Sequence, residues 1–245
     1  MNPADLPTAA TLPRPDARTA HWRPGLPGAL HSEIFASSKD GSGAGAALAL
    51  ARDALRVVGR DREEPRGVLW VQDAASIRLT GRPYRPGLPE DLRRALIHVA
   101  AGKAEDALFA LEEGLRCRDL ACVIGEIAGN PKAFDFTASR RLSLTAEKHG
   151  VPLFLVRHDA ARDLSSARMR WQVRSAASPV PRWNQAAPGM PSWHAELFRA
   201  RNHVPGEWIL RDERERLTAE RPLHPAAPDH GDLAGAAGAG SLAAS

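Results

Sequence analysis

The chain has 245 residues, of which 43% are hydrophobic and 25% charged, and its formal net charge is +4. This length allows one sizeable hydrophobic core but is short for two full domains, and the apolar fraction excludes a wholly disordered protein. The sequence has no apolar run long enough to span a membrane, no signal-peptide pattern and only two cysteines, Cys117 and Cys122, so a reduced cytoplasmic protein is expected.

Composition divides the chain into a body and two tails. Residues 1–27 contain six prolines and no periodic apolar pattern, so they are expected to form a flexible lead-in. Residues 28–211 are expected to form the folded body. Residues 212–245 begin with a charged run, expected to add at most a helical turn or two, and continue as an Ala- and Gly-rich segment that cannot bury a core.

Within the body, apolar runs alternate with amphipathic segments. The expected strands are His31–Ala36, Gly67–Gln72, Leu96–Ala100, Leu120–Ile127, Val151–Val156, Met169–Val173, Glu196–Arg201 and Trp208–Arg211. The expected helices are Ala46–Val58, a short one near Glu90–Arg94, Ala104–Arg116 and Thr137–His149. Helical crossovers between the first five strands predict a mainly parallel sheet flanked by helices, and the last three strands predict an antiparallel extension. The fold class is therefore α/β.

The loop after the first strand, residues 37–45, lies where α/β sheets bind ligands. The loop has the glycines and the position of a phosphate-binding loop, and these glycines are Gly41, Gly43 and Gly45. The loop lacks the Gly-Lys-Ser/Thr that holds phosphates and magnesium, and Asp40 places a negative charge where an anion would bind. Lys39 precedes the glycines instead of following them. The residues favour an inert connecting loop over weak nucleotide binding.

Two carboxylates lie at the ends of buried strands, on the same edge of the expected sheet. Glu126 is a candidate magnesium ligand through water, although the residues favour a helix cap or a solvent-facing side chain. Asp73 is a formal candidate for a general base. No His or Cys lies at metal-ligand spacing from the two cysteines, which are interpreted as buried thiols.

The run GALHSEIFASSKDGSGAGAALALARDAL, residues 28–55, resembles the opening strand, phosphate loop and helix of a RecA-type ATPase whose loop has decayed. Together with GVLWVQ, GRPYRPGL, LACVIGEI, TASRRL, RMRW and ELFRARN, it resembles the ImuA family, which comprises RecA-related proteins of bacterial damage-induced mutagenesis cassettes. The resemblance covers about residues 28–211 in order, and its most specific segments are TASRRL and the RMRW and ELFRARN pair.

The resemblance implies a RecA-like domain that is an accessory protein of error-prone translesion DNA synthesis. Its implied partners are an ImuB-type Y-family polymerase homologue, an error-prone C-family polymerase and RecA. The chain departs from the RecA pattern at the phosphate-loop Lys and Ser/Thr, the strand-terminal Asp and the catalytic Glu, so no enzymatic activity and no cofactor are expected. The alternatives are a SulA-type cell-division inhibitor and a RecA-like ATPase that binds ATP and Mg through Lys39 and Glu126.

Arginines in the most specific segments are candidates for contact with DNA or a protein partner. Arg140 and Arg141 are adjacent on a helix and point about 100° apart, so only one is expected to face a partner, while the alternative is an ion pair with a nearby carboxylate. Arg168 and Arg170 follow a loop that corresponds to a DNA-binding region in RecA-type proteins. That loop is short and partly acidic, which argues against a RecA-like filament, and Trp171 is expected to be buried.

The C-terminal strands are rich in tryptophan and arginine, the residues that dominate binding hot spots. Candidates for a partner surface are Trp193, Phe198, Arg199, Arg201 and Trp208, together with Trp183. The alternative is that these tryptophans cover the core of the sheet itself. The Pro-rich loop around Tyr84 either holds a peptide or covers the sheet.

Overall fold

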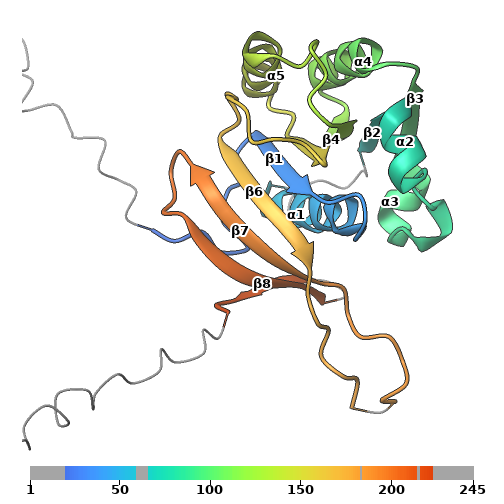
Figure 1. The fold of residues 1–245 in the computed structure, drawn as a ribbon, viewed down its shortest axis with the longest axis vertical. Coiled ribbons are helices and arrows are strands. Elements are labelled where there is room, and N and C mark those ends of the chain that lie inside the picture. Colours follow the sequence, from blue (N-terminus) through green and yellow to red (C-terminus); the bar gives the residue numbers. More distant parts are fainter. Residues whose placement is uncertain (1–19, 59–65, 183, 214–215, 223–245) are drawn as a thin grey trace, which may run out of the picture.

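The computed structural model describes residues 20–58, 66–182, 184–213 and 216–222 (Figure 1). The strands of the described part are β1 (His31–Ala36), β2 (Gly67–Asp73), β3 (Leu96–Ala101), β4 (Leu120–Ala128), β5 (Leu153–His158), β6 (Met169–Ser175), β7 (Ser192–Ala200), β8 (Gly206–Glu213) and β9 (Arg216–Glu220). The helices of the described part are α1 (Ser42–Val58), α2 (Ala74–Thr80), α3 (Glu90–Ala95), α4 (Ala104–Arg116) and α5 (Phe136–His149), together with the 3-10 turn η2 (Arg85–Gly87).

These strands form one sheet in the order β3-β2-β4-β5-β1-β6-β7-β8-β9. The strands from β3 to β6 are parallel, and β6 to β9 pair antiparallel. The α/β class, the mainly parallel sheet and its antiparallel extension are therefore confirmed. None of the described helices combines the length and apolar character needed to cross a bilayer.

Helix capping explains where the helices begin and end. α1 starts at Ser42, earlier than predicted, because the Asp40 carboxylate accepts a hydrogen bond from the Ser42 backbone N–H at 2.9 Å. Asp135 caps α5 by accepting from the Ala138 backbone N–H, and Gly150, in the left-handed conformation, caps its C-terminal end. α2 was not predicted, and its N-cap is Asp73, whose carboxylate accepts from the Ser76 backbone N–H at 2.7 Å. This cap explains Asp73 without a catalytic role.

The sheet extends beyond the predicted body at its C-terminal end. The prediction of helical turns in the charged run is wrong, because Arg216–Glu220 pairs with β8 as strand β9. Leu217 anchors β9, because its side chain is buried in the core and only 1% of its surface is exposed. On the N-terminal side, Trp22 is also buried, although it belongs to the predicted lead-in. Residues 1–19 and 223–245 of the two predicted tails lie outside the described residues.

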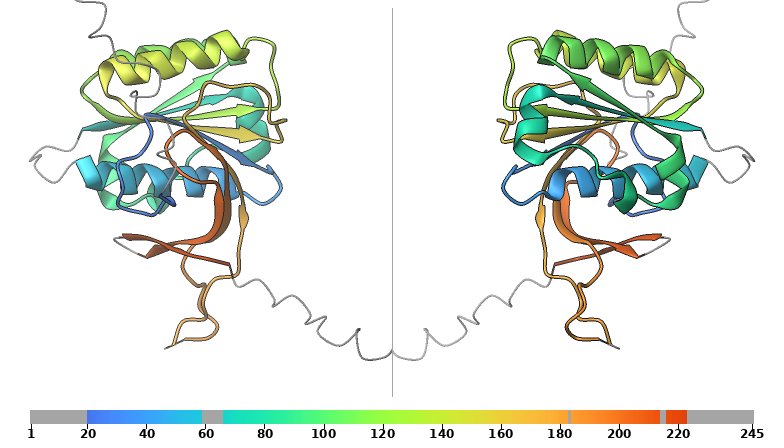
Figure 2. Two further views of the ribbon diagram at one scale, coloured as in Figure 1. Left: turned by 90° about the vertical axis from the view of Figure 1, so that its left-hand side faces the viewer. Right: turned by 90° about the vertical axis from the view of Figure 1, so that its right-hand side faces the viewer.

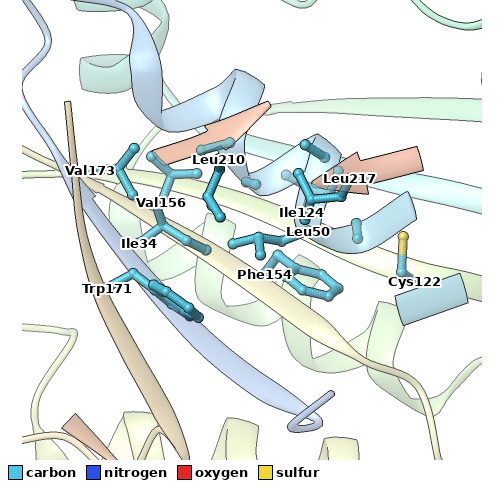
Figure 3. Packing of buried hydrophobic residues seen from close by; sticks show 14 of the residues in the cluster. Ile34, Leu50, Cys122, Ile124, Phe154, Val156, Trp171, Val173, Leu210 and Leu217 are labelled. Atoms are coloured by element: carbon cyan, nitrogen blue, oxygen red, sulfur yellow. The ribbon is translucent and has the colours of Figure 1, made fainter. Parts of the chain in front are cut away.

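Helices cover the two faces of the sheet in separate layers. α1 lies on one face, and α4 and α5 lie side by side on the other (Figure 2). Ile34, Phe154 and Trp171 pack in the cluster on the α1 side, as Figure 3 shows. Leu111 and Leu142 pack in the cluster beneath α4 and α5. β4 lies between both clusters, which confirms the prediction that this apolar strand is central and covered on both faces.

Candidate functional site

The N-terminus of α1 is occupied by the protein's own carboxylate. Asp40 accepts hydrogen bonds from the Ser42 backbone N–H and hydroxyl, at 2.9 and 2.6 Å, and from the Ser175 backbone N–H at 3.1 Å. Partial burial raises the pKa of Asp40, but these hydrogen bonds outweigh it and hold the pKa below its ordinary value. A permanent negative charge therefore sits where a phosphate would otherwise bind the helix.

The three glycines of this loop have structural reasons to be glycine. Gly41 has a φ of +63°, in the left-handed region that disfavours other residues. A Cβ on Gly43 would lie 2.7 Å from the Val156 side chain, and one on Gly45 would lie 3.1 Å from Trp193. The Lys39 side chain is exposed beside the loop. Turn geometry and close packing thus account for a glycine pattern that resembles a phosphate loop.

The close packing of Gly43 gives a direct prediction. Gly43→Ala is expected to lower the free energy of unfolding by about 1–3 kcal/mol, because the added methyl overpacks α1 against β5. Gly102→Ala is the matched control, since its Cβ would meet only Asp106 at an ordinary 3.8 Å. Urea denaturation followed by tryptophan fluorescence measures both. Equal stability of the two variants would contradict the packing explanation.

Glu126 is buried and held by side chains from neighbouring elements. Its Oε1 accepts hydrogen bonds from Trp70 Nε1 at 2.6 Å and from Gln72 Nε2 at 3.0 Å. Its Oε2 lies 2.6 Å from His158 Nε2 and accepts from the Thr80 hydroxyl at 3.4 Å. The expectation of a helix cap or a solvent-facing carboxylate is therefore wrong, because only 1% of Glu126 is exposed and both of its oxygens have partners.

The Glu126 cluster lies beside a pocket of about 410 Å³ at the carboxyl ends of the parallel strands. Gly41, Gly45, Tyr84 and His158 are among the residues that line it. Within the described ranges, no group of three or more His, Cys, Asp and Glu side chains is placed to hold a metal ion. The partners of Glu126 could not be found from sequence spacing alone, but polar residues at the ends of three apolar strands are the signal that marks them.

Four of the predicted contact arginines gather in one pocket on the α5 side of the sheet. Arg140 comes from α5, Arg168 immediately precedes β6, and Arg199 and Arg201 come from the end of β7 and the turn after it. The Arg201 backbone N–H donates to the Arg168 carbonyl at 2.9 Å, which joins two of these segments. The pocket has a volume of about 460 Å³. The structure thus brings together residues that lie far apart in the sequence.

The two remaining arginines of the predicted set lie elsewhere. Arg141 pairs with Glu112 of α4 at 3.0 Å, so the adjacent arginines of α5 face different surroundings, as predicted. Arg170 is buried and pairs through Nε with Glu33 of β1 at 2.8 Å. Arg170 therefore stabilises the interior of the sheet and is not exposed to a partner.

The tryptophans of the C-terminal strands pack inside the protein. Trp208 forms edge-to-face contacts with Trp22 and Trp171, at centroid distances of 5.6 and 5.9 Å. Trp193 is 6% exposed and lies against α1. Trp171 is buried as predicted, whereas the placement of Trp193 and Trp208 on an exposed partner surface is not supported by their burial. Trp183 lies outside the described residues.

The structure also places four further predicted residues, Phe198, Tyr84, Cys117 and Cys122. Phe198 is partly exposed on the face of β7 that points away from α1. The Arg162 guanidinium lies 4.0 Å from the centroid of the Phe198 ring. Tyr84 is 74% exposed in its loop. Cys122 is buried, and burial raises the pKa of its thiol to about 12, but Cys117 is exposed, so its prediction as a buried thiol is wrong.

A buried histidine lies beneath the four-arginine pocket. His31 Nδ1 lies 2.7 Å from the Ser143 hydroxyl. Burial lowers the pKa of His31 to about 4; Glu33 acts in the opposite direction, while Arg168 and Arg170 lower the pKa further. His31 is therefore neutral in the folded protein at neutral pH.

The lowered pKa of His31 predicts a loss of stability in mild acid. Above pH 6.5 the histidine is neutral in both states, but between pH 6.5 and about 4 the unfolded chain binds a proton that the folded chain does not. Stability should fall by up to about 1.4 kcal/mol per pH unit in this window and by about 3 kcal/mol in total. In His31→Asn this contribution should be absent. Urea unfolding at several pH values in this window tests it, and a constant difference between the two proteins would contradict it.

Neither a scan against models of known protein families nor a search of curated proteins finds a significant match to this chain.

Proposed function

We propose that this protein is a non-catalytic accessory protein of damage-induced, error-prone translesion DNA synthesis. It binds an ImuB-type Y-family polymerase homologue and an error-prone C-family polymerase, and RecA is a further candidate partner. The support for this proposal is the ordered resemblance of residues 28–211 to the ImuA family, carried most specifically by TASRRL, RMRW and ELFRARN. The α/β sheet with its antiparallel extension agrees with that resemblance.

The occupied N-terminus of α1 is the observation that carries the non-catalytic part of the proposal. Asp40 satisfies the first backbone donor of the helix and adds a negative charge there, which opposes nucleotide phosphates. Glu126 has hydrogen-bond partners on both oxygens, so it is a poor candidate for holding magnesium or activating water. Binding of partners, and not turnover of ATP, is the activity that remains.

Deletion of the gene tests the cellular function. We expect deletion to abolish the rise in mutation frequency after ultraviolet exposure while normal growth persists. Reintroduced wild-type protein and the Lys39→Ala variant should restore mutagenesis equally, because under this proposal the exposed Lys39 side chain does not bind a nucleotide. An unchanged mutation frequency in the deletion strain would refute the proposal. Micromolar binding of Mg-ATP that is lost in Lys39→Ala would refute its non-catalytic part.

Partner identity is tested by purifying the tagged protein from DNA-damaged cells and identifying the co-purifying chains by mass spectrometry. Recovery of the Y-family homologue and the C-family polymerase is expected. Recovery of the tubulin-like division protein instead, with filamentation on overexpression, would replace the proposal with a SulA-type division inhibitor.

A further inference from the structure

The four-arginine pocket collects positive charge that the described structure leaves largely uncompensated. Arg168 is paired, with its Nε 2.6 Å from Glu147 of α5. The side chains of Arg140, Arg199 and Arg201 are exposed, and none of them lies within ion-pair distance of a described carboxylate, while the Glu147 carboxylate also interacts electrostatically with Arg201. Like charges gathered on one surface repel each other unless an anion is bound between them. The pocket is therefore suited to an anionic ligand.

Hydroxyl groups form the floor of this pocket and are held in place by one another. The Ser143 and Ser166 hydroxyls lie 2.7 Å apart, and the Ser166 backbone N–H donates to the Ser139 hydroxyl at 3.0 Å. The Ser165 hydroxyl is anchored on Glu33 at 2.7 Å. The Ser143 and Ser165 hydroxyls are engaged by His31, Ser166 and Glu33, so the guanidinium groups at the pocket provide the donors that match the acceptor oxygens of a phosphate.

Helix α5 contributes two apolar side chains to the pocket on either side of Arg140. Phe136, Arg140 and Leu144 are spaced four residues apart, so they lie on one face of the helix, and all three line the pocket. Phe136 is 42% and Leu144 51% exposed. Proteins that bind single strands without sequence preference combine arginines for the backbone with aromatic rings on which bases stack. Figure 1 shows α5 close to the start of β6, and Ser165, Ser166 and Arg168 immediately precede that strand in the sequence.

We propose that this pocket binds the phosphodiester backbone of single-stranded DNA, with a base against Phe136. The choice of a DNA strand rests on the proposed function, whereas an anionic ligand follows from the pocket itself. The protein then contacts the template through the α5 side of the sheet, opposite α1. The volume of about 460 Å³ is within the range of pockets that hold a small ligand, and one nucleotide is of that size.

Fluorescence anisotropy of a labelled oligothymidine of about 20 nucleotides tests the proposal with the purified full chain. The pocket variant carries Arg140→Gln, Arg199→Gln and Arg201→Gln. We expect it to bind at least about tenfold more weakly than the wild type near 200 mM salt, with a log–log salt slope smaller by about 2. Phe136→Ala is expected to weaken binding without changing the salt slope, because it removes stacking and not charge.

A control variant removes the same charge from exposed arginines on the β3 side of the molecule, through Arg78→Gln, Arg94→Gln and Arg118→Gln. It should bind within about threefold of the wild type. Equal losses in the two triple variants, or no binding by the wild type near 50 mM salt, would overturn the proposal. Displacement of the DNA by polyaspartate at equal charge concentration would also overturn it, in favour of an acidic peptide. Because this assay contains no partner protein, its failure leaves the test of the accessory function intact.

Discussion

Replacing Glu126 with alanine is expected to lower the free energy of unfolding by about 3–5 kcal/mol. The substitution removes the acceptor shared by Trp70 and Gln72 and leaves His158 without its partner, and all three of these side chains are almost fully buried. A buried donor that loses its acceptor costs more than the hydrogen bond itself contributes, because no solvent replaces the acceptor. The loss should therefore exceed that of an ordinary surface substitution several-fold.

Two variants separate the hydrogen-bond explanation from general sensitivity at this position. Glu126→Gln is expected to retain most of the stability, since its amide oxygen still accepts and its amide nitrogen can donate to His158. Glu105→Ala, at an exposed position in the first turn of α4, should cost less than about 1 kcal/mol. Urea denaturation compares the three variants. If Glu126→Ala costs no more than Glu105→Ala, the buried cluster does not stabilise the fold.

Strong periodic patterns made most of the fold predictable. The run LACVIGEI is too apolar to be half-exposed, and β4 is indeed covered on both faces. The ends of α4 were predictable at Ala104 and Arg116 because its apolar residues keep helical spacing between turn residues. Strand β9 was not predictable, because Leu217 is the single large apolar residue in RLTAE and the neighbouring charged residues leave no alternating apolar pattern. Its pairing with β8 supplies the stabilisation that its own sequence lacks.

The Glu126 cluster forms through the register of neighbouring strands, and this register could not be predicted from the sequence. Gln72 lies opposite Glu126, and Glu126 lies opposite Val156, so His158 is two residues further along β5 and faces the same side. Trp70 is likewise two residues before Gln72. Each strand alone is an apolar run with one or two polar residues near its end, and only the alignment of the strands shows that these residues form a hydrogen-bonded cluster. The same holds for Arg168 and Arg201, which become neighbours through antiparallel pairing of β6 with β7.

Arg170 is expected to be a structural residue despite its place in a motif that resembles a DNA-binding segment. Arg170→Met should lower the free energy of unfolding by about 3–5 kcal/mol, because Glu33 is left as a buried and unpaired carboxylate. Arg174→Met, at an exposed position of the same strand, is the control and should change stability by less than about 0.5 kcal/mol.

The double variant Glu33→Gln/Arg170→Met decides whether the ion pair or the packing of Arg170 matters more. Removing both charges is expected to recover much of the loss, since a neutral Gln can still accept from the Ser165 hydroxyl and Met fills the space beside Phe35. If the double variant is as unstable as Arg170→Met, the loss comes from the contact of the guanidinium with the Phe35 and Phe198 rings instead.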